Sequence, residues 1–246
     1  MRIDVLTLFP EFVSTVAEYG ITGRAASNKL FELHTWNPRD EAQNRHNSVD
    51  DRAYGGGPGM VMQIEPLRRS LKAVRAARDD NAPVIVLSPQ GERFDQAYAR
   101  RLAAGSGAIL ISGRYEGFDE RFIQSEVDLE LSVGDYVLSG GELPAMVVID
   151  AIARLLPGAL GDAESAVQDS FTAGLLDHPQ YTRPEQDKSG QVPEVLLSGD
   201  HAAIDRWRLK QALGRTWLRR PDLVENLELN TEKQQLLKEF LDELRA

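Results

Sequence analysis

The chain has 246 residues, 28 basic and 38 acidic side chains, a formal net charge of −10 and no cysteine. The absence of cysteine excludes disulfide frameworks, zinc–thiolate sites, iron–sulfur clusters and cysteine nucleophiles. No stretch of about 18 apolar residues occurs, and Asp4 stands where a signal peptide would have its apolar segment. We therefore expect a soluble cytoplasmic protein that has no membrane partner.

Short apolar segments alternate with helical patterns up to residue 156, which predicts an α/β domain with a parallel sheet. The expected strands are 3–8, 31–36, 83–87, 108–111 and 127–132. The expected helices are 11–19, 65–78, 95–104 and 142–156. Pro144 stands in the first turn of the last helix, and Pro157 with Gly158 ends it. The long polar segment 37–59 is expected to be functional or disordered.

The character of the sequence changes after residue 156. Residues 157–175 are rich in Gly, Ala, Ser and Asp without a period, which is typical of a linker. Helical patterns at 202–214 and 232–244 then predict a smaller helical domain. We expect a first domain over 1–156, a linker over 157–175 and an all-helical second domain over 176–246.

Three glycine-bearing segments each follow an apolar strand: 87–91 (LSPQG), 113–117 (GRYEG) and 132–141 (SVGDYVLSGG). Ligands of parallel sheets bind outside the carboxyl ends of the strands, where such segments meet. Glycines let main-chain groups approach a flat heterocycle, and Tyr115 and Tyr136 are placed to form walls. The three segments together predict a ligand pocket.

Other familiar sites are excluded. No Gly-x-Gly-x-x-Gly follows the first strand, and 55–59 (GGGPG) lacks the Lys and Ser/Thr of a P-loop. There is no Gly-x-Ser-x-Gly, and the four histidines are too scattered for a metal site. We predict no metal site.

A basic segment interrupts the acidic chain. Six basic residues and no acid occur from Arg206 to Arg220, together with Trp207 and Trp217. Basic side chains among aromatic ones are typical of RNA binding. A solvated helix face with two core tryptophans is the alternative that the sequence leaves open.

Arg154 and Asp169 also allow two interpretations. Arg154 can complement the end of its helix or donate to a carbonyl or phosphate oxygen. Asp169 lies in the linker near Ser165 and Ser170, where turn chemistry is the simpler interpretation. From these residues alone the structural interpretation is favoured for both.

Six motifs occur in a fixed order: 44–60 (with NRH, DDR and GGGPGM), 87–91, 113–117, 134–144 (GDYVLSGGELP), 169–171 (DSF) and 176–184 (LDHPQYTRP). In this combination the chain resembles the bacterial tRNA (guanine-N1)-methyltransferase family, which modifies guanosine 37 beside the anticodon. The resemblance covers essentially the whole chain. One departure is Val86, where the family pattern has an aromatic residue.

The resemblance implies a SPOUT fold, in which a deep trefoil knot in the parallel sheet domain holds S-adenosyl-L-methionine as the methyl donor. It also implies a homodimer with the active site at the subunit interface. The C-terminal domain helps to bind the anticodon stem-loop of tRNA, and DNA is not an expected partner. By motif, Asp169 is implied to be the general base, and Arg154 to donate to O6 of guanine.

The implied cofactor-binding residues are Leu87, Ser88, Pro89, Gly113, Tyr115, Glu116, Val133, Gly134, Asp135, Tyr136, Val137, Leu138, Gly140, Gly141 and Pro144. The implied substrate-binding residues, with the basic segment included, are His46, Asp50, Gly59, Ser165, Ser170, Asp177, Arg183, Arg208, Arg215 and Arg220. We expect methylation of N1 of guanosine 37 in tRNA. The alternatives are a SPOUT methyltransferase for another RNA position, a catalytically silent RNA-binding module, and an α/β enzyme for a different nucleotide.

Overall fold

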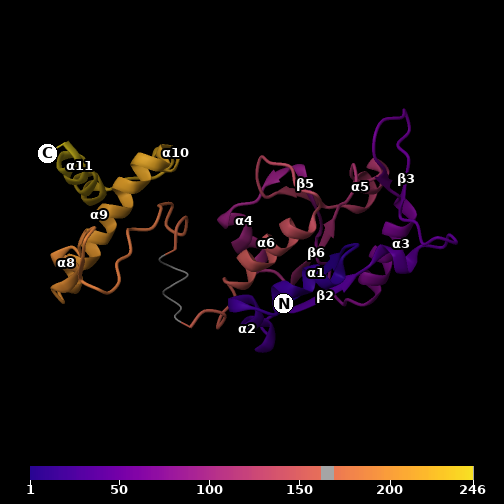
Figure 1. Cartoon of the computed structure of the whole chain (residues 1–246), viewed down its shortest axis with the longest axis horizontal. Helices are drawn as coiled ribbons and strands as arrows, with labels where there is room; N and C mark the ends of the chain where they lie inside the picture. The colour runs from indigo at the N-terminus through magenta and orange to yellow at the C-terminus, as the bar shows by residue number, and fades with distance from the viewer. Residues whose placement is uncertain (162–168, 246) are drawn as a thin grey trace. The chain divides into compact units, whose positions relative to one another are not determined.

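The structure is a computed structural model that describes residues 1–161 and 169–245 of the chain. The chain divides into two compact units, Met1–Ala163 and Glu164–Ala246 (Figure 1). The division falls within the segment 157–175 that was expected to be a linker. None of the described helices is both long enough and apolar enough to cross a lipid bilayer.

The first unit contains a five-stranded parallel sheet, which confirms the predicted α/β class. Its strands are β1 (Arg2–Leu6), β2 (Glu32–Trp36), β5 (Val84–Arg93), β6 (Gly107–Ser112) and β7 (Leu129–Ser132). Their order in the sheet is β2-β1-β6-β5-β7, and all neighbours run parallel. The segments that follow β6 and β7 therefore emerge at the same edge, beside the far half of β5.

Helices cover both faces of this sheet. One face carries α1 (Pro10–Ser14), α2 (Gly20–Ser27), α4 (Gln96–Ala103) and α6 (Glu142–Ala153), and the other carries α3 (Ile64–Ala76) and α5 (Glu120–Glu126). Successive residues of a strand point to opposite faces. Ile85 and Leu87 thus join the first core, while Val84 and Val86 join the second. The unit is a three-layer α/β/α structure.

Parts of the first unit differ from the prediction. Residues 87–91 are not a loop but belong to β5, whose pairing with β7 shifts register between Leu87 and Glu92. The predicted helix 11–19 ends early as α1 and continues as a 3-10 turn, Thr15–Ala17. Helix α2 was missed because it contains two glycines. Gly23 is needed there, since a Cβ would lie 2.6 Å from the carbonyl carbon of Glu18.

The second unit is built on two long helices, α9 (His201–Arg219) and α11 (Thr231–Arg245), which share an apolar core through Leu213 and Leu236. Helix α9 passes the predicted end at residue 214 because Gly214 is a contact point: a Cβ there would collide with the Phe240 ring. The remaining elements are α8 (Glu194–Leu197), α10 (Pro221–Glu225) and a hairpin of β8 (Gln186–Asp187) and β9 (Gly190–Gln191). The hairpin was not expected, so the unit is not purely helical.

Candidate active site

A cavity of about 450 Å³ lies at the carboxyl edge of the sheet, between the far half of β5 and the segments that follow β6 and β7. Of the residues expected to bind a cofactor, those that line it are Leu87, Ser88, Pro89, Gly113, Tyr115, Glu116, Val133, Gly134, Tyr136, Val137, Leu138, Gly140, Gly141 and Pro144. Asp135 is not part of the lining. The parallel topology thus brings three distant segments around one hollow.

Further lining residues were not predicted. They are Gln90, Arg114, Gly117, Phe118, Glu120, Ile123, Glu130, Leu131, Ser132 and Ser139. Gln90, Arg114, Gly117, Ser132 and Ser139 stand inside the three glycine-bearing segments, so their position in the sequence was a sufficient signal. The others come from β7 and from the region of α5, and their place depends on packing that no local pattern records.

Two local conformations shape the cavity wall. Tyr115 has a φ of 60°, which few residues other than glycine adopt, and its hydroxyl accepts a hydrogen bond from Nη2 of Arg39 at 3.3 Å. Gly134 has a φ of 149°, and a Cβ there would lie 2.5 Å from Cε1 of Tyr136. The Tyr136 ring therefore lies directly against the backbone at residue 134, which requires glycine.

The charged residues that line the cavity are mostly acidic: Glu116, Glu120 and Glu130 stand against Arg114. The guanidinium of Arg114 is itself held by a buried carboxylate, because its Nε donates to Oε2 of Glu142 at 2.8 Å. A cavity with this balance favours a cationic ligand over an anionic one.

The segment 37–59 is joined to the cavity through its glycine-rich end. Gly59 has a φ of 80°, and a Cβ there would collide with the carboxyl group of Glu116. Backbone hydrogen bonds fix this contact: Glu116 N donates to Met60 O at 2.9 Å, and Met62 N to Gly117 O at 2.8 Å. The structure thus brings an expected substrate-binding residue, Gly59, next to an expected cofactor-binding residue, Glu116.

The other two expected substrate-binding residues of this segment lie before the glycines. Asp50 is half-buried in β3 (Asp50–Asp51), which pairs antiparallel with β4 (Val61–Met62). His46 is exposed, and its backbone N–H donates to Oδ1 of Asn44 at 3.1 Å. Strands of two residues are too short for a period-two pattern, which is why the sequence showed only a polar segment.

The departure at Val86 does not reach the cavity. The side chain is fully buried in the core under α3 and α5, and it is absent from the cavity lining. A smaller residue at this position is therefore a matter of packing on the opposite face of β5.

The two expected catalytic residues belong to different units. Arg154 is the C-cap of α6 and is half-buried. Asp169 is exposed in the second unit, where its carbonyl oxygen accepts a hydrogen bond from Thr172 N at 3.2 Å. Next to it, Oγ of Ser170 accepts from Asp177 N at 2.9 Å. The predicted substrate residue Ser165 lies outside the described residues.

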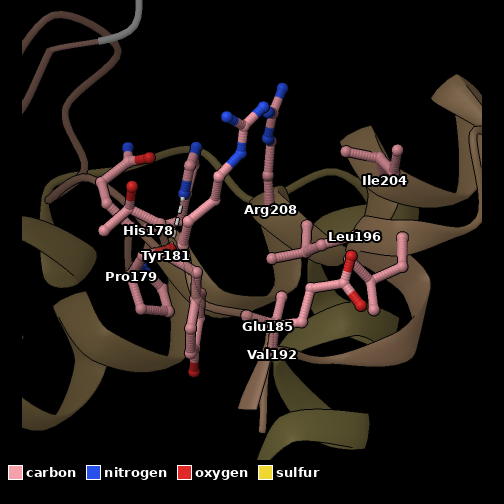
Figure 2. A pocket seen from close by; sticks show the side chains of 12 residues that line it. His178, Pro179, Tyr181, Glu185, Val192, Leu196, Ile204 and Arg208 are labelled. Carbon is pink, nitrogen blue, oxygen red and sulfur yellow. Dashed lines mark hydrogen bonds between the residues drawn. The ribbon is translucent and has the colours of Figure 1, made fainter. Parts of the chain in front are cut away.

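A second cavity, of about 430 Å³, lies within the second unit and includes the expected substrate-binding residues Arg183 and Arg208. Figure 2 shows the guanidinium of Arg208 pointing away from the apolar side chains of Val192 and Leu196. The Trp207 ring packs near His178 and Tyr181, with ring centroids 6.4 and 6.2 Å away. Six consecutive residues, 178–183, form one wall of this cavity.

The basic segment is largely neutralised by acids from elsewhere. The ion pairs are Arg206–Glu239 at 2.8 Å, Arg208–Asp205 at 3.6 Å, Lys210–Glu243 at 2.6 Å and Arg220–Asp222 at 2.6 Å. In the described part of the second unit, Arg215 and Arg219 form no ion pair. Trp217 is 42% exposed, so the interpretation with both tryptophans in a core is wrong.

The family model and the similar proteins all carry the same family description. A family model described as tRNA (Guanine-1)-methyltransferase TrmD matches residues 1–226. A Halorhodospira halophila protein named tRNA (guanine-N(1)-)-methyltransferase is 62% identical over 245 residues, covering 100% of this chain and 93% of that protein. Proteins of the same name from Methylococcus capsulatus and Shewanella denitrificans are 60% and 59% identical, covering 98% and 99% of this chain and 96% and 98% of theirs. The chain belongs to the tRNA (guanine-1)-methyltransferase family.

Proposed function

We propose that the protein transfers a methyl group from S-adenosyl-L-methionine to N1 of guanosine 37 in tRNA. The observation that carries this proposal is the cavity at the carboxyl edge of the sheet. Three of the family's motifs line it, and the chain belongs to that family. We further propose a SPOUT-type knotted fold, a cytoplasmic location and the anticodon stem-loop as the part of tRNA that is bound.

The cavity fits the proposed cofactor in size and charge. A volume of about 450 Å³ is within the usual range for small-molecule sites. The sulfonium of S-adenosylmethionine is cationic, and the lining carries three carboxylates against one guanidinium that Glu142 already binds. Main-chain groups of 87–90, 113–117 and 132–141 would hold the adenosine, and Glu116 would face the positive charge.

The reaction requires removal of a proton from the base. When bound, S-adenosylmethionine supplies an electrophilic methyl group on its sulfur. N1 of guanine carries a proton at neutral pH, so the nitrogen becomes a nucleophile only as that proton leaves. Asp169 accepts the proton, and Arg154 donates to O6, where negative charge develops as N1 is deprotonated. The target base must leave its stack to be reached.

We also propose that the protein is a homodimer and that the active site forms at the subunit interface. The outer face of α6 exposes Leu143 and Val147, and α1, which packs against α6, exposes Phe12; each is more than 40% exposed. Arg154 comes seven residues after Val147, and this spacing of about two turns places both residues on the same side of the helix. Apolar residues gathered in this way are typical of interfaces. Sedimentation should give a dimer for the wild type and a monomer for Val147→Asp.

The test of the reaction is methyl transfer from labelled S-adenosylmethionine to two tRNA transcripts that differ only at position 37, guanosine or adenosine. Label on the guanosine transcript alone is the expected result. Label on both would keep the methyltransferase and move the target to another position. Label on neither, with cofactor binding confirmed by calorimetry, would overturn the proposed activity.

A further inference from the structure

The first residue of α6, Glu142, is a buried carboxylate that stands outside the cavity lining yet contacts it. Its side chain is only 1% exposed. Oε1 accepts a hydrogen bond from Oγ1 of Thr7 at 2.9 Å, and Oε2 accepts from Nε of Arg114 at 2.8 Å. A buried carboxylate is costly unless it is bound in this way, so the two contacts belong together.

The Thr7 hydroxyl is oriented by a third group. Thr7 directly follows β1 and is fully buried. Its Oγ1 accepts a hydrogen bond from Phe9 N at 3.0 Å, so its single proton is directed at Glu142. The residue is also tied to the sheet, because its backbone N–H donates to Trp36 O at 2.9 Å. The carboxylate is thereby anchored to the rigid centre of the unit.

On the other side, Arg114 links two walls of the cavity. It belongs to the segment after β6, and its Nη1 donates to Ser139 O at 3.2 Å in the segment after β7. Its guanidinium carbon lies 4.4 Å from the ring centroid of Phe9. The two segments also touch through their backbones, since Gly141 N donates to Gly113 O at 2.8 Å.

The glycines at this contact leave room for the guanidinium. A Cβ on Gly140 would collide with Arg114 and would lie 2.7 Å from Oε2 of Glu142. A Cβ on Gly141 would lie 2.6 Å from the Cα of Ser112. The close approach of the two segments therefore depends on glycine at both positions and on one guanidinium in a single orientation.

We propose that Glu142 is a positioning residue for methyl transfer: with Thr7 it orients Arg114, which holds the segment 132–141 against the segment 113–117 and so sets the shape of the cofactor cavity. The inference rests on the proposed function, because it assigns a cofactor to that cavity. Neither Glu142 nor Thr7 lines the cavity, and both act through Arg114.

The test measures binding of S-adenosylhomocysteine, the demethylated cofactor, by calorimetry on the full chain, together with tRNA affinity and the thermal midpoint. Glu142→Gln keeps the shape and replaces the acceptor for Arg114 by an amide, and it should weaken binding about tenfold or more. Thr7→Val should weaken it roughly threefold, while Thr7→Ser, which keeps the hydroxyl, should restore it.

Two matched controls lie in the same unit. Glu126→Gln removes a carboxylate that binds Arg68 and Arg75 on α3, and Thr22→Val removes a buried hydroxyl in α2. Both should leave cofactor affinity and tRNA affinity unchanged. Hydrogen exchange of the segment 132–141 should become faster in Glu142→Gln and stay unchanged in the controls.

Wild-type cofactor affinity in a folded Glu142→Gln variant would overturn the inference. So would an equal loss in Thr7→Ser and Thr7→Val, or a loss in the controls as large as in Glu142→Gln, because these results would indicate general destabilisation. If Glu142→Gln does not fold, the Thr7 pair decides. A wild-type chain that binds neither S-adenosylmethionine nor S-adenosylhomocysteine would contradict the proposed function itself.

Discussion

The cavity of the first unit and helix α9 of the second both place charge where a ligand is proposed, but they do so differently. The cavity gathers its carboxylates from the segment after β6, from α5 and from β7, and its one guanidinium is bound by Glu142. On α9 the basic residues lie close together in the sequence, yet acids of α11 bind Arg206 and Lys210. Charge along the chain is therefore a poor guide to charge in space.

The two regions call for different substitutions. In the cavity wall the chain segments approach so closely at Gly134, Gly140 and Gly141 that a single added carbon there should matter. On α9 only cations without an ion-pair partner can bind phosphate at full strength, and in the described residues these are Arg215 and Arg219. The proposed general base, Asp169, lies outside both regions in the sequence.

The largest effect is expected for Asp169→Asn. Losing the proposed general base should lower the single-turnover methylation rate by about 10²–10⁴-fold, because proton transfer from N1 would lose its acceptor. Cofactor and tRNA affinities should stay close to those of the wild type. An unchanged rate would exclude Asp169 as the general base.

The second largest effect is expected on the free energy of unfolding. It compares a buried carboxylate of the first unit with an exposed carboxylate of the second. Asp4 is fully buried and binds Arg2, Trp36 and Arg78, whereas Glu239 binds Arg206 at the surface. Asp4→Asn should lower the free energy of unfolding by about 3 kcal/mol at pH 7. Glu239→Gln should change it little. Hydrogen exchange of β1 and β2 measures the first unit separately from the second.

The pH dependence of that difference has a definite sign. Burial raises the pKa of Asp4, but hydrogen bonds from Arg2, Trp36 and Arg78 outweigh it and hold the pKa below the usual range. The stabilisation is therefore full above about pH 4, the pKa of an unfolded Asp, and is lost as the pH falls through the lower native value. Wild type and Asp4→Asn should differ by a constant amount from pH 7 to 5 and converge at lower pH. Convergence already near pH 6 would contradict this assignment.

A smaller effect is expected when a methyl group is added to the cavity wall. Gly140→Ala places a Cβ against Arg114 and Glu142 and should weaken cofactor binding by about 1–3 kcal/mol through overpacking. Gly105→Ala is the matched control, because its nearest neighbour is Leu102 O at 3.4 Å and its backbone is not left-handed. Calorimetry with S-adenosylhomocysteine compares the two variants. Equal affinities in both would show that the close approach at residue 140 does not shape the cavity.

The smallest effect is expected on α9, for the cations that are free to bind tRNA phosphates. Arg215→Ala with Arg219→Ala should weaken different tRNAs alike and reduce the slope of log affinity against log salt by about 0.7–0.9 for each lost phosphate contact. Arg206→Ala with Lys210→Ala removes the same net charge but only residues that already bind acids. This second pair should keep the wild-type slope. Equal slopes for both pairs would mean that only total charge matters.

Much of the first unit was predictable because its elements repeat a simple period. Apolar runs predict the strands near residues 3–8, 31–36, 83–87, 108–111 and 127–132. The predicted helix 95–104 begins where Asp95 caps α4, accepting a hydrogen bond from Tyr98 N at 2.8 Å. The glycine-containing helix α2 and the two-residue strands were missed. In those cases the decisive contact, such as Gly23 against Glu18, comes from packing that the local pattern does not contain.

The candidate site was also only partly predictable from the sequence. The three segments of the cavity were predicted because glycines after strands mark a ligand edge in parallel sheets, although 87–91 lies in β5 and not in a loop. Glu120 and Glu130 escaped notice because nothing near them in the sequence marks a site. The neutralisation of the basic segment was not predicted either, because the acids that bind it, Glu239 and Glu243, belong to the next long helix.

Periodicity and motif spacing are properties of the chain, and they were sufficient to predict the fold class, the family and the order of the motifs. Which charges meet depends on the three-dimensional fold. The parallel sheet carries Glu116, Glu120 and Glu130 to one hollow, and Glu142 reaches Thr7 across the unit. Electrostatic and packing energies depend on separation in space, and spacing along the chain does not record that separation.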